Sequence, residues 1–319
     1  MSSPQDLSAE DKTARAKKKF LWNRKGGKNQ SESRLAAFLL TPSVILIIVL
    51  VGIPMLYALY LSLHKVDIVA GEFNLLPVGL GNYIDLLDDP RFFPTIWRTL
   101  QFTLLRLFIS LSAGLSLALL LNQATTIAAQ ILNRLFLIPW ALSFVVNGLM
   151  WKWMYNGDYG IINYVLYNLG FIDGYKSWLG QTSTALIAVT IADAWKSIPF
   201  IALLILAGLK SIPEELYEAA KVDGAGILGR FRHITLPGLR SVLLVTFIMQ
   251  TMWSIKAFAS IWPVTMGGPA DATMLLNIYA YQQSFMFLNL GYGSALAYVI
   301  TAIILMLTLA YLAALRMEE

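Results

Sequence analysis

Long apolar segments separated by short polar ones dominate this chain. A helix that crosses a bilayer needs about 20 consecutive, mostly apolar residues. Six segments satisfy this requirement, at approximately residues 36–61, 99–121, 135–154, 185–209, 241–263 and 293–315. The pattern predicts an all-α, polytopic membrane protein with six transmembrane helices.

Two of these segments contain residues that shape helices. Pro54, in the first, cannot donate a backbone hydrogen bond, which predicts a kink. Gly114 and Ala118 lie four residues apart in the second, and small residues at this spacing let another helix approach closely. Arg106 lies roughly 12 Å into the same segment at 1.5 Å per residue. We expect its side chain to face the bundle interior or to reach outward to the membrane surface.

The distribution of basic residues predicts the topology. Residues 1–34 contain nine of the 24 Lys and Arg residues and are otherwise polar, which indicates a disordered, cytoplasmic tail. With this tail inside, both termini are cytoplasmic, and the inner segments hold 16 basic residues against four outside. The tail is followed by a membrane domain at residues 35–315 and a short cytoplasmic end at 316–319.

Composition excludes several classes of function. The 319 residues are 57% hydrophobic and only 13% charged, against about 25% charged residues in soluble domains. Without cysteine there are neither disulfides nor thiolate metal sites, and two distant histidines, His64 and His233, do not support a histidine-rich site. The net charge of +5 is concentrated on one side of the membrane, so it does not indicate a nucleic-acid partner.

One long polar segment, residues 210–240, lies between the fourth and fifth apolar segments and reads KSIPEELYEAAKVDGAGILGRFRHITLPGLR. Ser211 followed by Glu214 predicts a capping box at the start of a helix. Residues 214–222 are rich in helix formers, and Gly224 predicts the helix end.

The rest of this segment predicts a second short helical piece at residues 227–233. Thr235 and Pro237 are typical of the cap and first turn of the next long helix. A helix-turn-helix of this kind, held at the membrane at both ends, indicates a docking element for a soluble partner.

The spacing of the residues in this loop resembles the EAA loop of bacterial ABC importer permeases. The matching positions are Glu218-Ala219-Ala220, Gly224, Ile234 and Leu236-Pro237, with Asp223, Ala225 and Phe231 between them. Five further stretches resemble the maltose-type carbohydrate permease family of these importers: the GLGNY at 79–83, Pro139-Trp140, the NGDYG at 156–160 with Asn163, the TMGGP at 265–269 with Thr273, and residues 291–295.

This resemblance implies a type I importer permease in a bacterial inner membrane. Its partners would be a second, similar permease, two cytoplasmic ATP-binding subunits, an extracytoplasmic solute-binding protein and the lipid bilayer. The helix at 214–222 would then act as a coupling helix seated on one ATPase subunit, with five key positions: Glu218, Ala219, Ala220, Asp223 and Gly224. The alternative for Glu218 is a local ion pair with Lys221.

The chain contains no recognisable motif for ATP hydrolysis. Gly26-Gly27-Lys28 lacks the upstream glycine of a phosphate-binding loop and is followed by Asn29 rather than Ser or Thr. No catalytic or metal-binding constellation is visible either. We therefore expect a transport subunit rather than an enzyme, with ATP and Mg²⁺ bound by the partner subunits.

Polar residues within the apolar segments are the candidates for a substrate pathway, because each is costly in lipid. They are Asp193 and Lys196 in the fourth segment, and Gln250, Trp253 and Lys256 in the fifth. Polar groups beside an aromatic ring are suited to a sugar. The alternative is a structural ion pair of Asp193 with Lys196 or Lys256, beside a packed tryptophan.

Three other functions stay open from the sequence. One is an ABC permease for a non-sugar solute such as a glycerophosphodiester, since related permeases overlap in these motifs. A secondary transporter is a weaker one, since no internal repeat is visible. A multi-pass membrane enzyme would need an acid, base or metal constellation that the sequence lacks. Because the outer loops are too short to form a domain, high-affinity capture of a solute would need a separate protein.

Overall fold

The computed structural model describes residues 33–69, 72–123 and 136–316. Residues 1–32 of the tail predicted at 1–34 and residues 317–319 of the end predicted at 316–319 lie outside the described residues, whereas Ser33 and Arg34 already belong to a helix. Residues 1–60 and 61–319 form two separate units. The first contributes most of one helix, Ser33–Ser62, which includes a π-helical turn, η1 (Ile48–Gly52), and α2 (Ile53–Ser62). The turn ends two residues before Pro54, so the helix stays continuous but changes its hydrogen-bonding pattern close to the position of the missing N–H.

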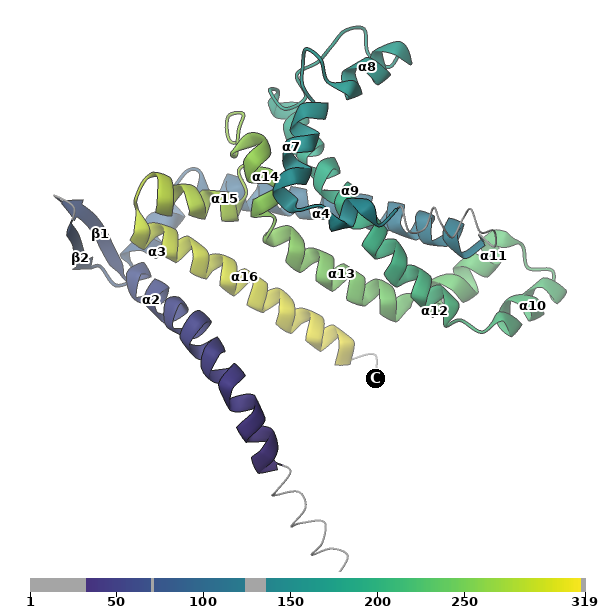
Figure 1. Ribbon diagram of the computed structural model, residues 1–319, viewed down its shortest axis with the longest axis horizontal. Helices are drawn as coiled ribbons and strands as arrows, with labels where there is room; N and C mark the ends of the chain where they lie inside the picture. The colour runs from purple at the N-terminus through teal and green to yellow at the C-terminus, as the bar shows by residue number, and fades with distance from the viewer. Residues whose placement is uncertain (1–32, 70–71, 124–135, 317–319) are drawn as a thin grey trace, which may run out of the picture. The chain divides into compact units, whose positions relative to one another are not determined.

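The second unit is mostly helical, with one small sheet (Figure 1). β1 (His64–Val69) pairs antiparallel with β2 (Glu72–Pro77), so the all-α prediction is wrong at this hairpin. The helices are α3 (Gly81–Asp88), α4 (Phe92–Gln123), α6 (Ile138–Ala141), α7 (Phe144–Met154), α8 (Ile161–Asn168), α9 (Thr182–Lys210), α10 (Glu214–Val222), α11 (Ile227–Arg230), η2 (Phe231–Thr235), α12 (Leu236–Gly238), α13 (Arg240–Ile255), α14 (Phe258–Thr265), α15 (Leu276–Tyr281), η3 (Gln282–Met286) and α16 (Leu290–Arg316).

Four helices in the described residues are long and apolar enough to cross a bilayer: Ser33–Ser62, Phe92–Gln123, Thr182–Lys210 and Leu290–Ala313. A fifth is a pair, Ile227–Gly238 and Arg240–Ile255, bent by 65°. Six unbroken helices are not found, because two predicted segments are interrupted. In the third, the chain turns at Leu142–Ser143, and Ser143 caps α7 by accepting a hydrogen bond from the amide of Val146. In the fifth, α13 ends before Lys256 and α14 starts at Phe258.

The centre of the second unit is the contact between α4 and α9. The two helices run parallel, since Arg106 faces Asp193 and Gly114 faces Ile201 farther along both. A Cβ on Gly114 would lie 2.5 Å from Cγ2 of Ile201, and Ala118 is fully buried. The close approach predicted from these two small residues is confirmed.

The helix α13 runs antiparallel to α9, and α16 runs antiparallel to α13. Leu239, just before α13, packs with Leu209 at the end of α9, whereas Gln250 lies level with the Arg106–Asp193 pair. Tyr311 near the end of α16 donates a hydrogen bond to Thr251 at 3.2 Å. The directions of α4, α9, α13 and α16 are those expected when successive spans alternate in direction.

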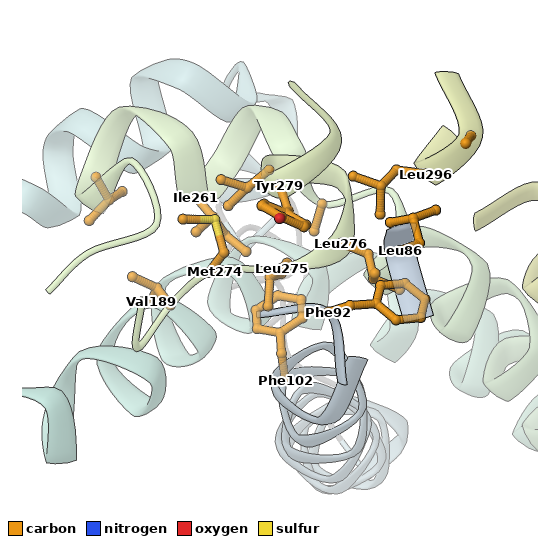
Figure 2. Close-up of a cluster of buried hydrophobic side chains, with 14 residues drawn as sticks. Leu86, Phe92, Phe102, Val189, Ile261, Met274, Leu275, Leu276, Tyr279 and Leu296 are labelled. Atoms are coloured by element: carbon orange, nitrogen blue, oxygen red, sulfur yellow. The ribbon is translucent and has the colours of Figure 1, made fainter. Parts of the chain in front are cut away.

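A large apolar cluster joins the ends of these helices on the side of α3 and α15 (Figure 2). Its most buried members include Leu86 of α3, Phe102 of α4, Tyr279 of α15 and Leu296 of α16. In Figure 1, α10 and α11 lie at the opposite end of α9 and α13 from this cluster. The segment with α10 and α11 and the apolar cluster thus lie at opposite ends of these helices, and the Arg106–Asp193 pair lies between them.

Candidate functional sites

The helix α10 covers Glu214–Val222, as the sequence predicts. It ends in a Schellman motif: the amide of Ala225 donates to the carbonyl of Ala220 at 2.8 Å, and the amide of Gly224 donates to that of Lys221 at 3.1 Å. Gly224 has φ +77°, a left-handed conformation that favours glycine, and no atom lies within 4 Å of where its Cβ would be. The glycine is therefore needed for the backbone turn and not for space.

Two local signals at the ends of this loop are misleading. The predicted capping box does not form, because the hydroxyl of Ser211 donates back to the carbonyl of Gly208 at 2.8 Å, and Pro213 precedes the first residue of α10. Thr235 is no cap either: it has helical dihedral angles within η2, and the long helix α13 begins only at Arg240. Ser211 is thus the C-cap of α9, and Thr235 lies inside a helical segment that continues to Gly238.

The coupling-loop candidates Glu218, Ala219, Asp223 and Gly224 are exposed, and Ala220 is half-buried. Glu218 forms no ion pair with Lys221 or any other described residue. Three apolar side chains around them are also strongly exposed and were not identified from the sequence: Val222 at 88%, Ile227 at 81% and Leu228 at 78%. Clustered apolar exposure of this kind is typical of a protein-binding surface.

The loop is attached to the membrane helices at two points. The hydroxyl groups of Tyr217 on α10 and Thr235 on η2 lie 3.0 Å apart and share a hydrogen bond. Ile212, between α9 and α10, packs against Gly238, where an added Cβ would lie only 2.7 Å from Cδ1 of Ile212. These two contacts hold α10 and Ile212, which precedes it, against η2 and α12, which lead into α13.

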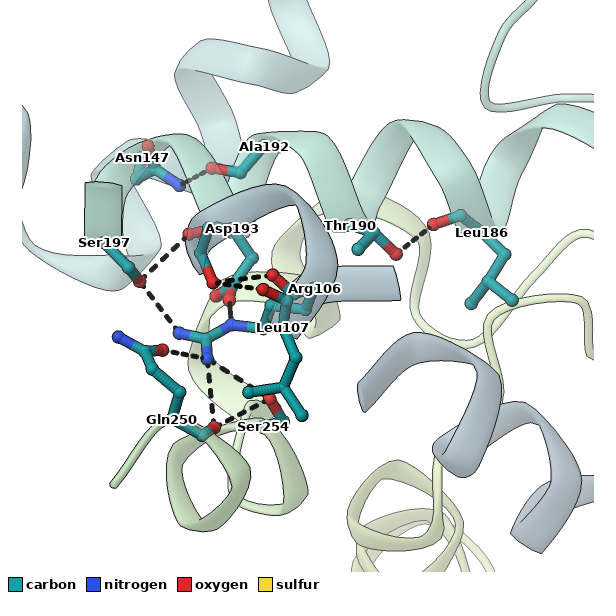
Figure 3. A network of polar contacts seen from close by, with 11 residues as sticks. Arg106, Leu107, Asn147, Leu186, Thr190, Ala192, Asp193, Ser197, Gln250 and Ser254 are labelled. Atoms are coloured by element: carbon teal, nitrogen blue, oxygen red, sulfur yellow. Dashed lines mark hydrogen bonds and ion pairs between the residues drawn. The ribbon is translucent and has the colours of Figure 1, made fainter. Parts of the chain in front are cut away.

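The second candidate region is a buried polar network around Arg106 of α4 (Figure 3). Its guanidinium forms an ion pair with Asp193 and donates to the hydroxyl of Ser197 at 2.8 Å, both on α9. On α13 it donates to the side chain of Gln250 and to the hydroxyl of Ser254. Arg106 faces the interior, as one of its two predicted orientations requires.

This network changes the interpretation of two predicted substrate-pathway residues, Asp193 and Gln250. Asp193 does form a structural ion pair, but with Arg106 instead of the predicted Lys196 or Lys256. Gln250 is fully buried behind Arg106 and does not line the neighbouring cavity. The sequence could not identify Arg106 as the centre, because it is separated from its partners by 87 to 148 positions.

A cavity of about 520 Å³ lies beside this network, between α4, α6, α7, α9 and the break between α13 and α14. Four of the five predicted pathway residues line it: Asp193, Lys196, Trp253 and Lys256. The other lining residues are Arg106, Trp140, Phe144, Ser197, Ala257, Ala259 and Ser260. The cavity thus combines aromatic rings with charged and hydroxyl groups.

The aromatic and cationic groups of the cavity are held in place by their neighbours. The ammonium of Lys196 donates to the carbonyl of Trp140 at 2.8 Å and lies 4.3 Å from the centre of the Phe144 ring. The ring of Phe200 packs between Trp140 and Trp253, with centroid distances of 5.2 and 5.7 Å. Trp140, Phe144 and Phe200 were not among the predicted pathway residues.

A third polar group, far from the cavity, joins the start of α4 to α15 and α16. Arg91 forms a two-bond ion pair with Asp271, with distances of 2.8 and 3.0 Å, and its guanidinium lies over the ring of Tyr279. The carboxylate of Asp89 accepts hydrogen bonds from Tyr279 and Tyr292. In the part of the chain that the structure describes, no group of three His, Cys, Asp or Glu residues could hold a metal ion.

Comparison with known proteins gives a family match and several similar proteins. Residues 110–316 match the family described as "Binding-protein-dependent transport system inner membrane component". The chain is 39% identical to the sulfoquinovosyl glycerol transport system permease protein of Agrobacterium fabrum, over 89% of this chain and 91% of that protein. It is 35% identical to the trehalose/maltose transport system permease protein of Thermococcus litoralis, over 88% and 93%.

A solved structure shares the fold. A chain of a bacterial alginate ABC transporter, crystallised with an alginate pentasaccharide-bound periplasmic protein, superposes with a TM-score of 0.76. The match covers 89% of this chain and 94% of that chain at 19% identity. The two curated relatives are permease subunits, which are transport components and not enzymes.

Proposed function

The chain belongs to the family of binding-protein-dependent transport system inner membrane components, and from this premise we propose that it imports a carbohydrate as the permease subunit of an ATP-driven transporter. The names of the two curated relatives, which refer to sulfoquinovosyl glycerol and to trehalose and maltose, support a saccharide over another solute. Its partners would be a second, similar permease, two cytoplasmic ATP-binding subunits that hold ATP and Mg²⁺, and an extracytoplasmic solute-binding protein.

The observation that carries this proposal is the cavity beside Arg106. A saccharide needs groups that exchange hydrogen bonds with its hydroxyls and an aromatic surface for the apolar face of its ring. Asp193, Lys196 and Ser260 supply the first, and Trp253 supplies the second. Gln250 would act indirectly, by holding the Arg106 side chain that borders the cavity.

The mechanism would be alternating access driven through α10. Closure of the ATP-binding subunits would carry α10 with it, with Glu218, Ala219, Ala220, Asp223 and Gly224 at the contact. The contacts of Tyr217 with Thr235 and of Ile212 with Gly238 would pass this movement to α9 and α13. Both helices line the cavity, so their movement would open it to one side of the membrane or the other.

We also propose six membrane crossings with both termini in the cytoplasm. The third crossing would consist of α6 and α7, and the fifth of α13 and α14, each interrupted where it borders the cavity. Irregular backbone within a membrane is tolerated where it lines a cavity. With α10 inside, the alternating directions of α4, α9, α13 and α16 are consistent with this arrangement.

Purification of the tagged chain from its native membrane in mild detergent tests the assignment. We expect an ATP-binding subunit and a second permease to co-purify, and the complex to hydrolyse ATP. Deletion of the chain should abolish growth on one or more saccharides offered as sole carbon source. A chain that purifies alone, without ATPase activity, and that transports in response to an ion gradient would contradict the proposal.

A further inference from the structure

The cavity beside Arg106 carries more positive than negative side chains. Its lining includes Arg106, Lys196 and Lys256 against the single carboxylate of Asp193, which is already paired with Arg106. The hydrogen bond and the ring contact of Lys196 are both with neutral groups. Neither lysine forms an ion pair with a described residue. The formal charge of the lining is therefore +2.

The backbone of α14 adds to this positive character. Its first residues, Ala259 and Ser260, line the cavity, directly after the break at Lys256. The first amide groups of a helix have no acceptor within the helix, and its N-terminus carries a partial positive charge. Helix N-termini that are open to a ligand bind anionic groups for these two reasons.

A separate observation at the same place is a buried polar group of the protein that lacks a hydrogen-bond partner. Ser260 is one of the lining residues, it is only 5% exposed, and its buried hydroxyl has no hydrogen-bond partner among the described residues. A buried hydroxyl without a partner is unfavourable by about 1–3 kcal/mol. A rotation of the Ser260 side chain would let its hydroxyl donate to a ligand oxygen at the start of α14.

We propose that the cavity recognises an acidic saccharide, one that carries a carboxylate, sulfonate or phosphate group. This inference rests on the proposed function, in which a saccharide passes through the cavity. A neutral sugar would leave the buried charge of Lys196 without a counter-ion, which is unfavourable, and would offer no partner to the more exposed Lys256. An anionic group would pair with both ammonium groups and accept from Ser260, while the sugar ring packs on Trp253.

The absence of cysteine makes the charge of the cavity measurable. In the Ala259→Cys variant of the complete transporter, a single thiol would report on the cavity from its lining. The rates of its modification by an anionic and by a cationic methanethiosulfonate reagent are each divided by that reagent's rate with a free thiol. Modification is followed on this chain by mass spectrometry, so thiols of partner subunits do not interfere.

We expect the normalised ratio of anionic to cationic rates to exceed 1 by about tenfold or more, since the two reagents respond with opposite sign to the same potential. Adding Lys196→Gln or Lys256→Gln should lower this ratio severalfold. Adding Lys152→Gln should not, because Lys152 is an exposed lysine of α7 outside the cavity. Glucuronate should protect the cysteine, and glucose at the same concentration should protect it much less.

Each contrary result has a separate meaning. A normalised ratio near 1 would overturn the proposed anion site. Equal protection by glucose and glucuronate would overturn the preference for an acidic sugar and leave the proposed carbohydrate import standing. A high ratio without protection by either sugar would support the anion site and contradict passage of a saccharide through this cavity.

Discussion

Arg106 on α4 and Asp193 on α9 form an ion pair in which both side chains are almost completely buried. Removal of one member would leave the other as an unpaired buried charge, which typically costs about 3–5 kcal/mol. We therefore expect Asp193→Asn and Arg106→Met each to lower the thermal unfolding temperature of the purified transporter strongly. The double variant Arg106→Met/Asp193→Leu should recover part of the loss. A double variant as unstable as the sum of the single ones would contradict this account.

Because α4 and α9 are in close contact at Gly114, even the methyl group of an alanine at this position should overpack the interface. In Gly114→Ala the new Cβ would lie 2.5 Å from Cγ2 of Ile201, so the helices must separate, at a cost of about 1–3 kcal/mol. The additional change Ile201→Ala removes the clashing atom and should restore part of the stability. Thermal unfolding of the three variants measures this. A lack of any rescue would indicate that the contact is not the cause.

Gly224 adopts a left-handed backbone conformation that the neighbouring Gly226 does not share, so substitutions at the two positions should differ in their effects. Gly224→Val forces a β-branched residue into the left-handed region, where the cost exceeds the roughly 1–2 kcal/mol typical of L-residues, whereas Gly224→Asn is tolerated better. We expect uptake of solute to fall strongly in the valine variant and to persist in the asparagine variant.

Gly226 is the matched control, since it has φ −69° and equally open surroundings. Gly226→Val should leave both uptake and membrane insertion unchanged. Equal losses in Gly224→Val and Gly226→Val would show that the loop tolerates no side chain at all, and the argument from φ would then fail.

The proposed coupling role of Glu218 predicts a loss of transport without a loss of folding. The side chain is exposed and makes no ion pair with described residues, so Glu218→Lys should leave the amount of membrane-inserted protein unchanged. Uptake and the stimulation of ATP hydrolysis by solute should fall by about tenfold or more, which corresponds to about 1.4 kcal/mol or more. Glu215→Lys, also exposed on α10, serves as the control. Normal uptake in the Glu218 variant would remove the coupling role.

The hydrogen-bonded carboxylate of Asp89 predicts that the thermal stability of the protein decreases at acidic pH. Burial opposes its ionisation, but hydrogen bonds from Tyr279 and Tyr292 and the amide and charge of Arg91 outweigh this and keep the pKa of Asp89 below its ordinary value of 3.8. A lowered pKa in the folded state means that its contribution is complete above the ordinary pKa and is lost as the pH falls through the folded value. We expect thermal stability to be insensitive to this group from pH 8 to pH 5 and to decline below about pH 4. The decline should be smaller in Asp89→Asn, and an equal decline would exclude Asp89 as its source.

Features that depend on neighbouring residues could be predicted from the sequence. The apolar segments, the helix at 214–222, its end at Gly224 and the close approach at Gly114 all follow from composition or from spacings of a few residues. Four of the five pathway candidates line the cavity because polar groups within apolar helices avoid lipid and face the protein interior. The family resemblance was likewise carried by local motifs, and the comparisons confirm it.

The tertiary structure alone decided which of these groups meet. Arg106 pairs with Asp193 and reaches Gln250 because three helices from distant parts of the chain pack together, and no local spacing encodes that choice of partner. Packing also decided that α13 stops before Lys256 and that Ser211 closes α9 without capping α10. Propensities act over a few residues, whereas the position of a buried charge depends on every helix around it. The sequence by itself thus determined the class of protein and its apolar segments, and only the packing decided where two of these segments break and how the polar groups of the cavity are arranged.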